Sequence, residues 1–269
     1  MNTAAAPMEI GQVTITVNDL TRNADFYARA LGLSKMTADA AHVTLGAGGK
    51  ALVTLIADPA ARARSPREAG LFHTAFLMPD RAALARWLHH AATTRLPLQG
   101  ASDHTVSEAI YLADPEGNGI EVYVDRPRTH WTGRDGKIQM ATDPLDLDNL
   151  AAAADGPWAG APDGMVVGHV HLQVGDVAQA QAFYTGTLGF PVTATYPGAA
   201  FYGAGGYHHH LATNVWNSRG AGPRTPSTGL TAVEIRADAP SLAAITAKTG
   251  GQTTLSDPWE TRITLTEKR

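Results

Sequence analysis

The chain has no cysteine among its 269 residues. Disulfides and thiolate metal sites are therefore excluded, and any metal must be held by His, Asp, Glu or backbone oxygen. Charged residues make up only 17 %, and the net charge of −4 comes without a basic stripe, so we expect no nucleic acid partner. No apolar run reaches the ~18 residues that a membrane span needs. The N-terminus lacks the charged flank and apolar core of a signal peptide, so we expect a cytoplasmic protein with no membrane contact.

The sequence does contain an internal repeat. Residues 13–33, VTITVNDLTRNADFYARALGL, are similar to residues 170–190, VHLQVGDVAQAQAFYTGTLGF. Three landmarks recur at one constant offset, namely Asp19, Tyr27 and Gly32 as Asp176, Tyr184 and Gly189. Both segments read as a strand, an aspartate and a helix. The constant offset indicates that the two halves of the chain arose by duplication.

Each half repeats the same pattern once more. Residues 72–91 and 230–250 again read as a strand, an aspartate and a helix. The aspartate after each first strand suits a helix N-cap, and alternating segments such as IEVYV and TRITLT predict half-buried strands. These aspartates are Asp19, Asp80, Asp176 and Asp238. The sequence therefore predicts an α+β fold of four tandem βαβββ modules.

A segment rich in Gly, Pro and Asp separates the two halves. We place the N-terminal domain, with two modules, at residues 1–126. A linker follows at 127–164, in which DPLDLDNLAAAA predicts a short helix. The C-terminal domain, at 165–269, also holds two modules, of which the last is shortened.

This pattern of paired modules resembles the vicinal-oxygen-chelate superfamily, which includes glyoxalase I, bleomycin-resistance proteins and extradiol ring-cleaving dioxygenases. The resemblance covers nearly the whole chain. It implies that the modules pair into two incompletely closed β-barrels, with a metal inside the cup. The fold alone does not choose among the functions of the group.

Equivalent positions on the first strands suggest metal ligands. The residues seven places before the four aspartates are Gln12, His73, His169 and Thr231. Because side chains alternate along a strand, these four share one face, while Phe72 takes the other. A single histidine here is most simply a core residue with a local hydrogen bond. Two histidines at the same repeat position favour metal ligands.

A third ligand should be anionic, and Glu121 is the candidate. It follows the turn DPEGNG (114–119), between two apolar neighbours. A glutamate that faces into a barrel is costly unless it is paired or bound to metal. In the alternative reading Glu121 faces solvent; the last module keeps Asp257 but carries Thr264 at the equivalent place. Two histidines and one carboxylate are typical of non-haem Fe(II) oxygenases and leave three coordination positions open.

Residues 103–121, DHTVSEAIYLADPEGNGIE, resemble a run characteristic of extradiol dioxygenases. The matching positions are His104, Ile110, Tyr111, Asp114, Pro115, Gly117 and Glu121. The resemblance implies that Glu121 and His73 are metal ligands. It also implies that Tyr111 and His104 contact the oxygens of the substrate or of its cleavage intermediate. A solvated loop histidine and a core aromatic are the alternatives for these two residues.

Three consecutive histidines, in HHHLA (208–212), belong to the module that begins GHVHL (168–172). The segment resembles the His-His-x-Leu-Ala stretch of extradiol enzymes, which implies that His169 binds the metal and that His209 is the acid/base catalyst. An imidazole with a pKa near ~6.5 suits that task. Alternation along a strand would place His208 and His210 opposite His209, as structural or rim residues. His171 shares a face with His169 and is the reserve ligand.

Together these features predict an extradiol dioxygenase of the catechol 2,3-dioxygenase type. It would insert O2 into catechol or a substituted catechol at Fe(II), which Mn(II) could replace, and homo-oligomers could form. The candidate ligands lie in the second and third modules, so the site must join the two halves, within one chain or between subunits. One alternative is a glyoxalase-type isomerase or lyase with His208 or His210 as fourth ligand. The other is a metal-free protein that sequesters a small molecule.

Overall fold

Each module opens with a strand that leads directly into a helix. The computed structural model describes residues 6–268. At every one of these junctions an aspartate side chain accepts a hydrogen bond from the backbone N–H three residues further on. The four residues are Asp19, Asp80, Asp176 and Asp238. The predicted N-caps are confirmed, and they explain why each helix begins where its strand ends.

The first half of the chain contains two complete modules. The first consists of β1 (Met8–Val17), α1 (Leu20–Leu31), β2 (Ser34–Ala38), β3 (His42–Ala47) and β4 (Lys50–Ala57). The second consists of β5 (Gly70–Leu77), α2 (Arg81–Thr93), β6 (Gly100–Asp103), β7 (Ser107–Ala113) and β8 (Gly119–Asp125). The connecting segment holds the 3₁₀ turn η2 (Arg128–His130), β9 (Asp143–Pro144) and α3 (Leu147–Ala151). The helix α3 lies in the stretch predicted to form one.

The second half repeats this order and then shortens it. Its first module consists of β10 (Val166–Gln173), α4 (Val177–Gln181), the π-helical turn η3 (Ala182–Thr187), β11 (Val192–Tyr196), β12 (Ala199–Tyr202) and β13 (Leu211–Asn214). The last module consists of β14 (Gly229–Ala237), α5 (Ala239–Lys248), β15 (Thr254–Ser256) and β16 (Arg262–Glu267). It has one strand fewer than the others.

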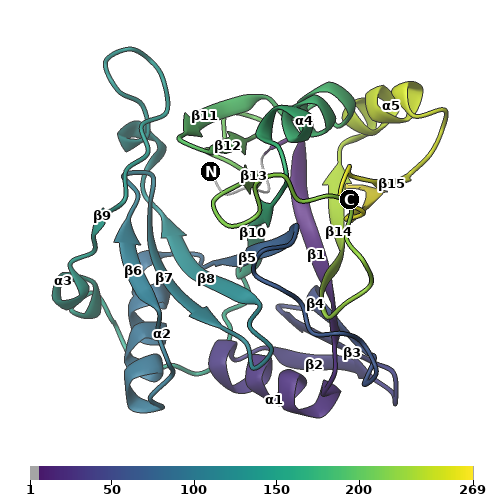
Figure 1. Ribbon diagram of the computed structural model, residues 1–269. Coiled ribbons are helices and arrows are strands. Elements are labelled where there is room, and N and C mark those ends of the chain that lie inside the picture. The colour runs from purple at the N-terminus through teal and green to yellow at the C-terminus, as the bar shows by residue number, and fades with distance from the viewer. Residues whose placement is uncertain (1–5, 269) are drawn as a thin grey trace.

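Two curved sheets form, and each takes strands from both halves of the chain (Figure 1). One has the order β15-β16-β14-β1-β4-β3-β2, and joins the first module to the fourth. The other has the order β11-β12-β13-β10-β5-β8-β7-β6-β9, and joins the second module to the third. The joins are the antiparallel pairs β1–β14 and β5–β10. The two halves predicted from the repeat are thus repeats in the sequence, while each sheet combines one module from each half.

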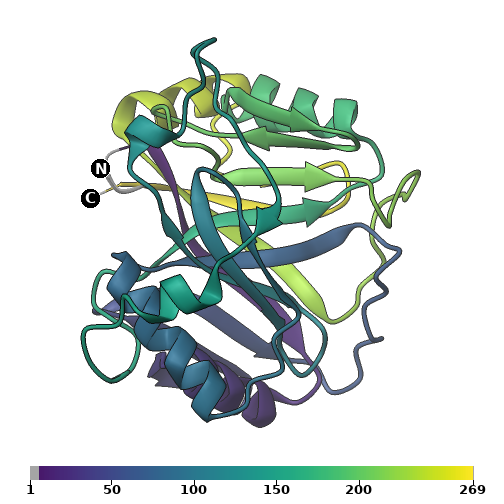
Figure 2. The same cartoon turned by 90° about the vertical axis from the view of Figure 1, so that its left-hand side faces the viewer.

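The helices pack at the two ends of the molecule. Figures 1 and 2 show α1 and α2 together at one end, and α4 and α5 at the other. Trp87 on α2 is fully buried, and its indole N–H donates to the carbonyl of Ala30 on α1 at 2.8 Å. Tyr27 and Tyr184, which correspond in the repeat, are also fully buried. The indole hydrogen bond joins α1 to α2 at their end of the molecule.

The observed fold is the α+β arrangement of two open, curved sheets that the sequence predicted. Within residues 6–268 the two edge strands of neither sheet pair with each other, so neither barrel closes. In that part of the chain no helix has both the length and the apolar character that a membrane crossing requires.

Candidate metal centre

Three neighbouring strands position the three predicted ligands. β5 runs between β8, which is parallel to it, and β10, which is antiparallel. The register places Ala75 of β5 opposite Glu121 on one side and opposite His169 on the other. His73 lies two residues before Ala75 and therefore on the same face. The small side chain of Ala75 leaves the space above it to the three larger ones.

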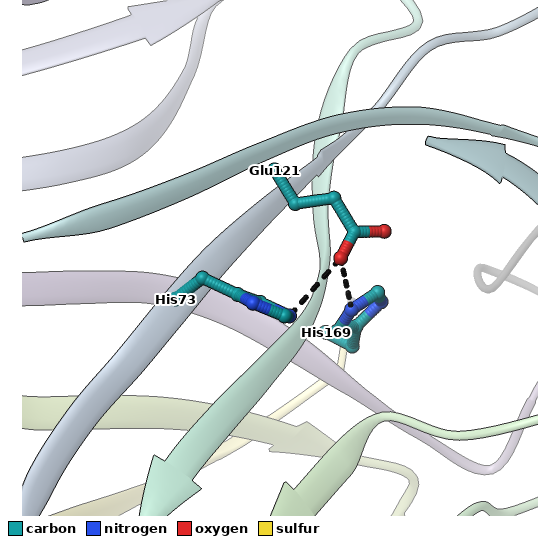
Figure 3. Close-up of side chains that lie close together, drawn as sticks. All are labelled: His73, Glu121 and His169. Carbon is teal, nitrogen blue, oxygen red and sulfur yellow. Dashed lines mark ion pairs between the residues drawn. The ribbon is translucent and has the colours of Figure 1, made fainter. Parts of the chain in front are cut away.

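The three side chains point toward one another from these strands (Figure 3). The Nε2 atom of His73 lies 3.0 Å from Oε2 of Glu121, and Nε2 of His169 lies 3.5 Å from the same oxygen. One ligand atom from each residue lies within 4.8 Å of the other two. All three residues are buried, with 7 % or less of their surface exposed. Among residues 6–268 this is the one such group of three or more His, Asp or Glu.

These donor atoms fit a divalent cation. Although His73 Nε2 is 3.0 Å from a carboxylate oxygen, it makes no hydrogen bond, so nitrogen and oxygen do not satisfy each other. Two ligands bound at about 2.1 Å and at right angles lie about 3.0 Å apart, which is the separation found here. A buried cation between them would satisfy both atoms. The set of two imidazoles and one carboxylate also leaves coordination positions for a substrate.

The protonation states of this cluster suit metal binding. Burial alone would raise the pKa of Glu121, but His169 and His73 beside it hold the pKa of this carboxyl well below its usual range. Burial lowers the pKa of His169 to about 4, against the opposing effect of Glu121. At neutral pH the site therefore offers an ionised carboxylate and a neutral imidazole, which are the forms that bind metals.

Tyr111 and His104 lie together on the next strand and the turn before it. Tyr111 on β7 is directly opposite Glu121 in the register, and its hydroxyl is 2.6 Å from Nε2 of His104. The Nδ1 of His104 lies 2.6 Å from the carbonyl of Ala141, which can only accept. Nδ1 therefore carries the proton, and Tyr111 donates to Nε2. Burial, helped by the charge of Glu121, raises the pKa of Tyr111 well above its usual value, so the phenol stays protonated.

The histidine triplet precedes β13, which begins at Leu211, so strand alternation does not apply to it. His209 lines the cavity, with its ring centroid 4.1 Å from that of His169. Burial lowers the pKa of His209 well below its usual value. His208 does not face away from His209, because their Nδ1 atoms are 2.8 Å apart. That prediction was wrong, because the backbone turns here instead of extending. His210 is fully buried.

The glyoxalase-type alternative requires His208 or His210 as a fourth ligand. Neither residue lies in the metal cluster. Both ring nitrogens of His208 have other partners, and Nδ1 of His210 accepts from the N–H of Ala204 at 3.2 Å. The reserve ligand His171 meets the ring of His73 edge-on, with ring centroids 5.0 Å apart and planes inclined by 87°. Its Nε2 is 3.0 Å from the amide nitrogen of Asn214. These residues surround the cluster without entering it.

A cavity of about 620 Å³ opens above the cluster. The segment 137–142 and β6–β7 line one side, and β11 and β12 line the other. Phe72 lines it too, although alternation predicted the opposite face. The register pairs His171 with His73 and Leu172 with Leu71, so Phe72 is an extra residue at a bulge. A bulge turns a side chain to the other face, and a sequence pattern does not show it.

Sequence reasoning also missed residues that lie outside the motif. Trp216, which follows β13, lines the cavity and is 45 % exposed, and its ring lies 5.4 Å from that of Phe72. Asp125, at the end of β8, contacts His208. Asp125 and Trp216 carry no signal of their own in the sequence. Their positions follow from the pairing of the second and third modules.

Comparison with known proteins agrees with this architecture. A family model described as the Glyoxalase/Bleomycin resistance protein/Dioxygenase superfamily matches residues 9–122 and 166–254. The chain is 39 % identical over 232 residues to a catechol-2,3-dioxygenase of Bacillus subtilis (strain 168), and the match covers 82 % of this chain and 80 % of that protein.

Solved structures share the fold. A putative dioxygenase from Bacillus subtilis matches 97 % of this chain and 85 % of its own, with a TM-score of 0.65 and 14 % identity. Glyoxalase I from Zea mays matches 98 % and 94 %, with a TM-score of 0.57 and 16 % identity. The sequence match over most of the chain, together with the two sheets and their cross-paired modules, shows that this protein belongs to the glyoxalase/bleomycin resistance protein/dioxygenase superfamily.

Proposed function

We propose that the protein is an extradiol ring-cleaving dioxygenase that inserts both atoms of O2 into a catechol, next to its pair of hydroxyl groups. The observation that carries this proposal is the convergence of His73, His169 and Glu121 beneath a cavity that His209 and Tyr111 also line. The 39 % identity to a protein named catechol-2,3-dioxygenase supports it. Fe(II) is the metal we propose, and Mn(II) could take its place, since this ligand set suits both.

The charge of the ligand set matches a catecholate. Imidazoles and carboxylates bind metals as neutral rings and as anions, so two histidines and Glu121 would leave a divalent cation with a net charge of +1, which favours an anionic chelating substrate. Bound Fe(II) would hold the substrate oxygens beside O2 and pass electron density from the ring to O2. The residues of the chain provide the cation site, the position of the ring and the proton transfers.

His209 and Tyr111 are the groups placed to handle protons. Burial lowers the pKa of His209 well below the value near ~6.5 that the sequence led us to expect, so His209 is neutral at pH 7 and has a lone pair for the proton of a substrate hydroxyl, although it is a weaker base than a free imidazole. Tyr111 keeps its proton and faces the same cavity, beside Glu121. Its O–H donates to Nε2 of His104 at 2.6 Å, which fixes the hydroxyl at the cavity wall and leaves its oxygen free to accept from a substrate hydroxyl.

The cavity favours a catechol that carries an apolar substituent. Its volume of about 620 Å³ lies in the range that accepts ligands much larger than one aromatic ring. Phe72, Trp216 and Phe201 form an aromatic wall around His171, with ring centroids 4.9 to 5.9 Å from its ring. Such a wall attracts an alkyl or aryl group.

The test is anaerobic reconstitution with Fe(II), followed by catechol or alkyl-substituted catechols and a measured amount of O2. We expect one O2 consumed per ring cleaved, with the absorbance of a ring-opened semialdehyde. Two variants test the ligand set. Glu121→Gln keeps the shape of the side chain but removes its charge, and His73→Ala removes an imidazole. Both should lose bound iron and oxygen uptake together. No oxygen uptake with any of these catechols would overturn the proposal. O2-independent turnover with Zn(II) or Ni(II) would favour a glyoxalase-type isomerase.

A further inference from the structure

His208 links the cavity to a carboxylate behind it. Its Nε2 lies 2.8 Å from Oδ1 of Asp125, and its Nδ1 lies 2.8 Å from Nδ1 of His209. Asp125 comes from β8 in the first half, and the two histidines from the loop before β13 in the second. His208 is fully buried, and the Asp125 side chain is 17 % exposed. The three side chains therefore form one continuous line of hydrogen bonds, largely shielded from solvent.

The surrounding residues hold this line in place. The hydroxyl of Tyr207 donates to the same carboxylate oxygen of Asp125 at 3.1 Å. Its ring lies over that of His208, with centroids 4.2 Å apart and planes inclined by 30°. Trp131 packs against the His208 ring at 4.9 Å, with its plane inclined by 68°. The His208 ring is thus in contact with two aromatic rings, which restrict its rotation.

The chemistry of the three groups sets the direction of each hydrogen bond. An ionised carboxylate can only accept, so Nε2 of His208 carries its proton toward Asp125. In a neutral imidazole the other nitrogen is then an acceptor, so Nδ1 of His208 has a lone pair. The proton between the two histidines must come from Nδ1 of His209. In a neutral His209 this leaves Nε2 without a proton.

We propose that Asp125 and His208 are positioning residues that hold His209 in the tautomer with Nδ1 protonated and Nε2 bare toward the cavity. The catalytic role of this tautomer rests on the proposed function, in which His209 takes a proton from a substrate hydroxyl. That O–H bond breaks as the Nε2–H bond forms, and the proton later returns to the product, so none is consumed. Throughout, Nδ1–H of His209 keeps its hydrogen bond to His208, and the ring keeps its orientation.

The tautomer can be read directly by nitrogen NMR of the histidine rings. Two-bond ¹H–¹⁵N correlation spectra of the protein loaded with diamagnetic Zn(II) distinguish a protonated ring nitrogen from a bare one. We expect a bare Nε2 and a protonated Nδ1 for His209. In His208→Phe and in Asp125→Asn we expect Nε2 of His209 to gain proton occupancy. A wild-type His209 that carries its proton on Nε2 would overturn the proposal.

Kinetics of the iron-loaded enzyme separate positioning from a merely structural role. Both variants should lower kcat about 10- to 100-fold and leave KM and bound iron within 2-fold of wild type. His210→Asn is the matched control, because His210 is equally buried and adjacent but lies outside this line of bonds. It should keep the tautomer and the kcat. An unchanged kcat in Asp125→Asn and His208→Phe would contradict the role in catalysis. If the wild type consumes no O2, the proposed function fails, while the spectra still decide the tautomer.

Discussion

The buried His210 makes the stability of the fold depend on pH in a way that can be calculated. Its side chain is fully buried, its Nε2 has no hydrogen-bond partner, and the rings of Phe190 and Tyr207 lie against it. Burial, with positive charge nearby, lowers its pKa from 6.5 to about 3. The folded state therefore keeps this imidazole neutral at a pH where the unfolded chain protonates it.

Whether stability rises or falls with pH follows from the pKa of His210 in the unfolded and the folded state. Above pH 6.5 neither state holds the extra proton, and the contribution of His210 to stability is fully present. As the pH falls below 6.5, His210 is protonated in the unfolded state but stays neutral in the folded state. The free energy of unfolding therefore decreases until about pH 3. At pH 5 the difference is about 1.5 pKa units, and at about 1.36 kcal/mol per unit the loss is about 2 kcal/mol.

The assay is urea unfolding of the metal-free protein at pH 7.5 and pH 5, for wild type and His210→Asn. The asparagine oxygen can still accept from the N–H of Ala204, but it does not titrate. The substitution costs stability at both pH values because it removes ring volume. The stability gap between wild type and variant should nevertheless shrink by about 2 kcal/mol at pH 5. An equal gap at both pH values would refute the reasoning.

Three further substitutions test the geometry of the site. Ala75→Leu places a larger side chain between Glu121 and His169 and should weaken Mn(II) binding at least about 10-fold in calorimetric titration. Unaltered affinity would show that metal binding does not need the space above Ala75. Gly168→Ala would press a methyl carbon against the hydroxyl oxygen of the buried Tyr123 and should cost about 1–3 kcal/mol in urea unfolding; an unchanged free energy of unfolding would show that the strand has room for the methyl group. Trp216→Ala should raise KM for an aryl-substituted catechol about 5-fold relative to catechol itself; an equal effect on both would remove Trp216 from the substituent wall.

The repeat made much of the fold predictable and also selected the three candidate ligands that the structure brings together. His73 and His169 stand at the same distance before their aspartates, and Glu121 follows a recognisable turn, so local patterns are enough to select them. The pairing of the second module with the third followed from where these candidates lie in the sequence. The pairing of β1 with β14 depends on contacts between distant segments, and the sequence left open whether one chain completes the site.

The errors arose where the backbone departs from regular geometry. Phe72 sits at a bulge, and the histidine triplet lies in a turn, so alternation assigned the wrong face to Phe72 and to His208. The contact between Asp125 and His208 joins residues 83 positions apart and depends on the packing of both modules. A pattern of neighbouring residues in the sequence cannot predict such a contact.

The cross-paired sheets bear on how the gene for such a chain arose. In this chain neither half completes a sheet with its own modules, because β1 pairs with β14 and β5 pairs with β10. The same pairing between two separate half-length copies would give two equivalent sheets and two equivalent sites. Once both copies were joined in one polypeptide, each site could change independently. The sheet that joins the first and fourth modules carries Gln12, Thr231 and Thr264 at the positions equivalent to the three candidate ligands, so after duplication the two sheets came to differ in their capacity to hold a metal.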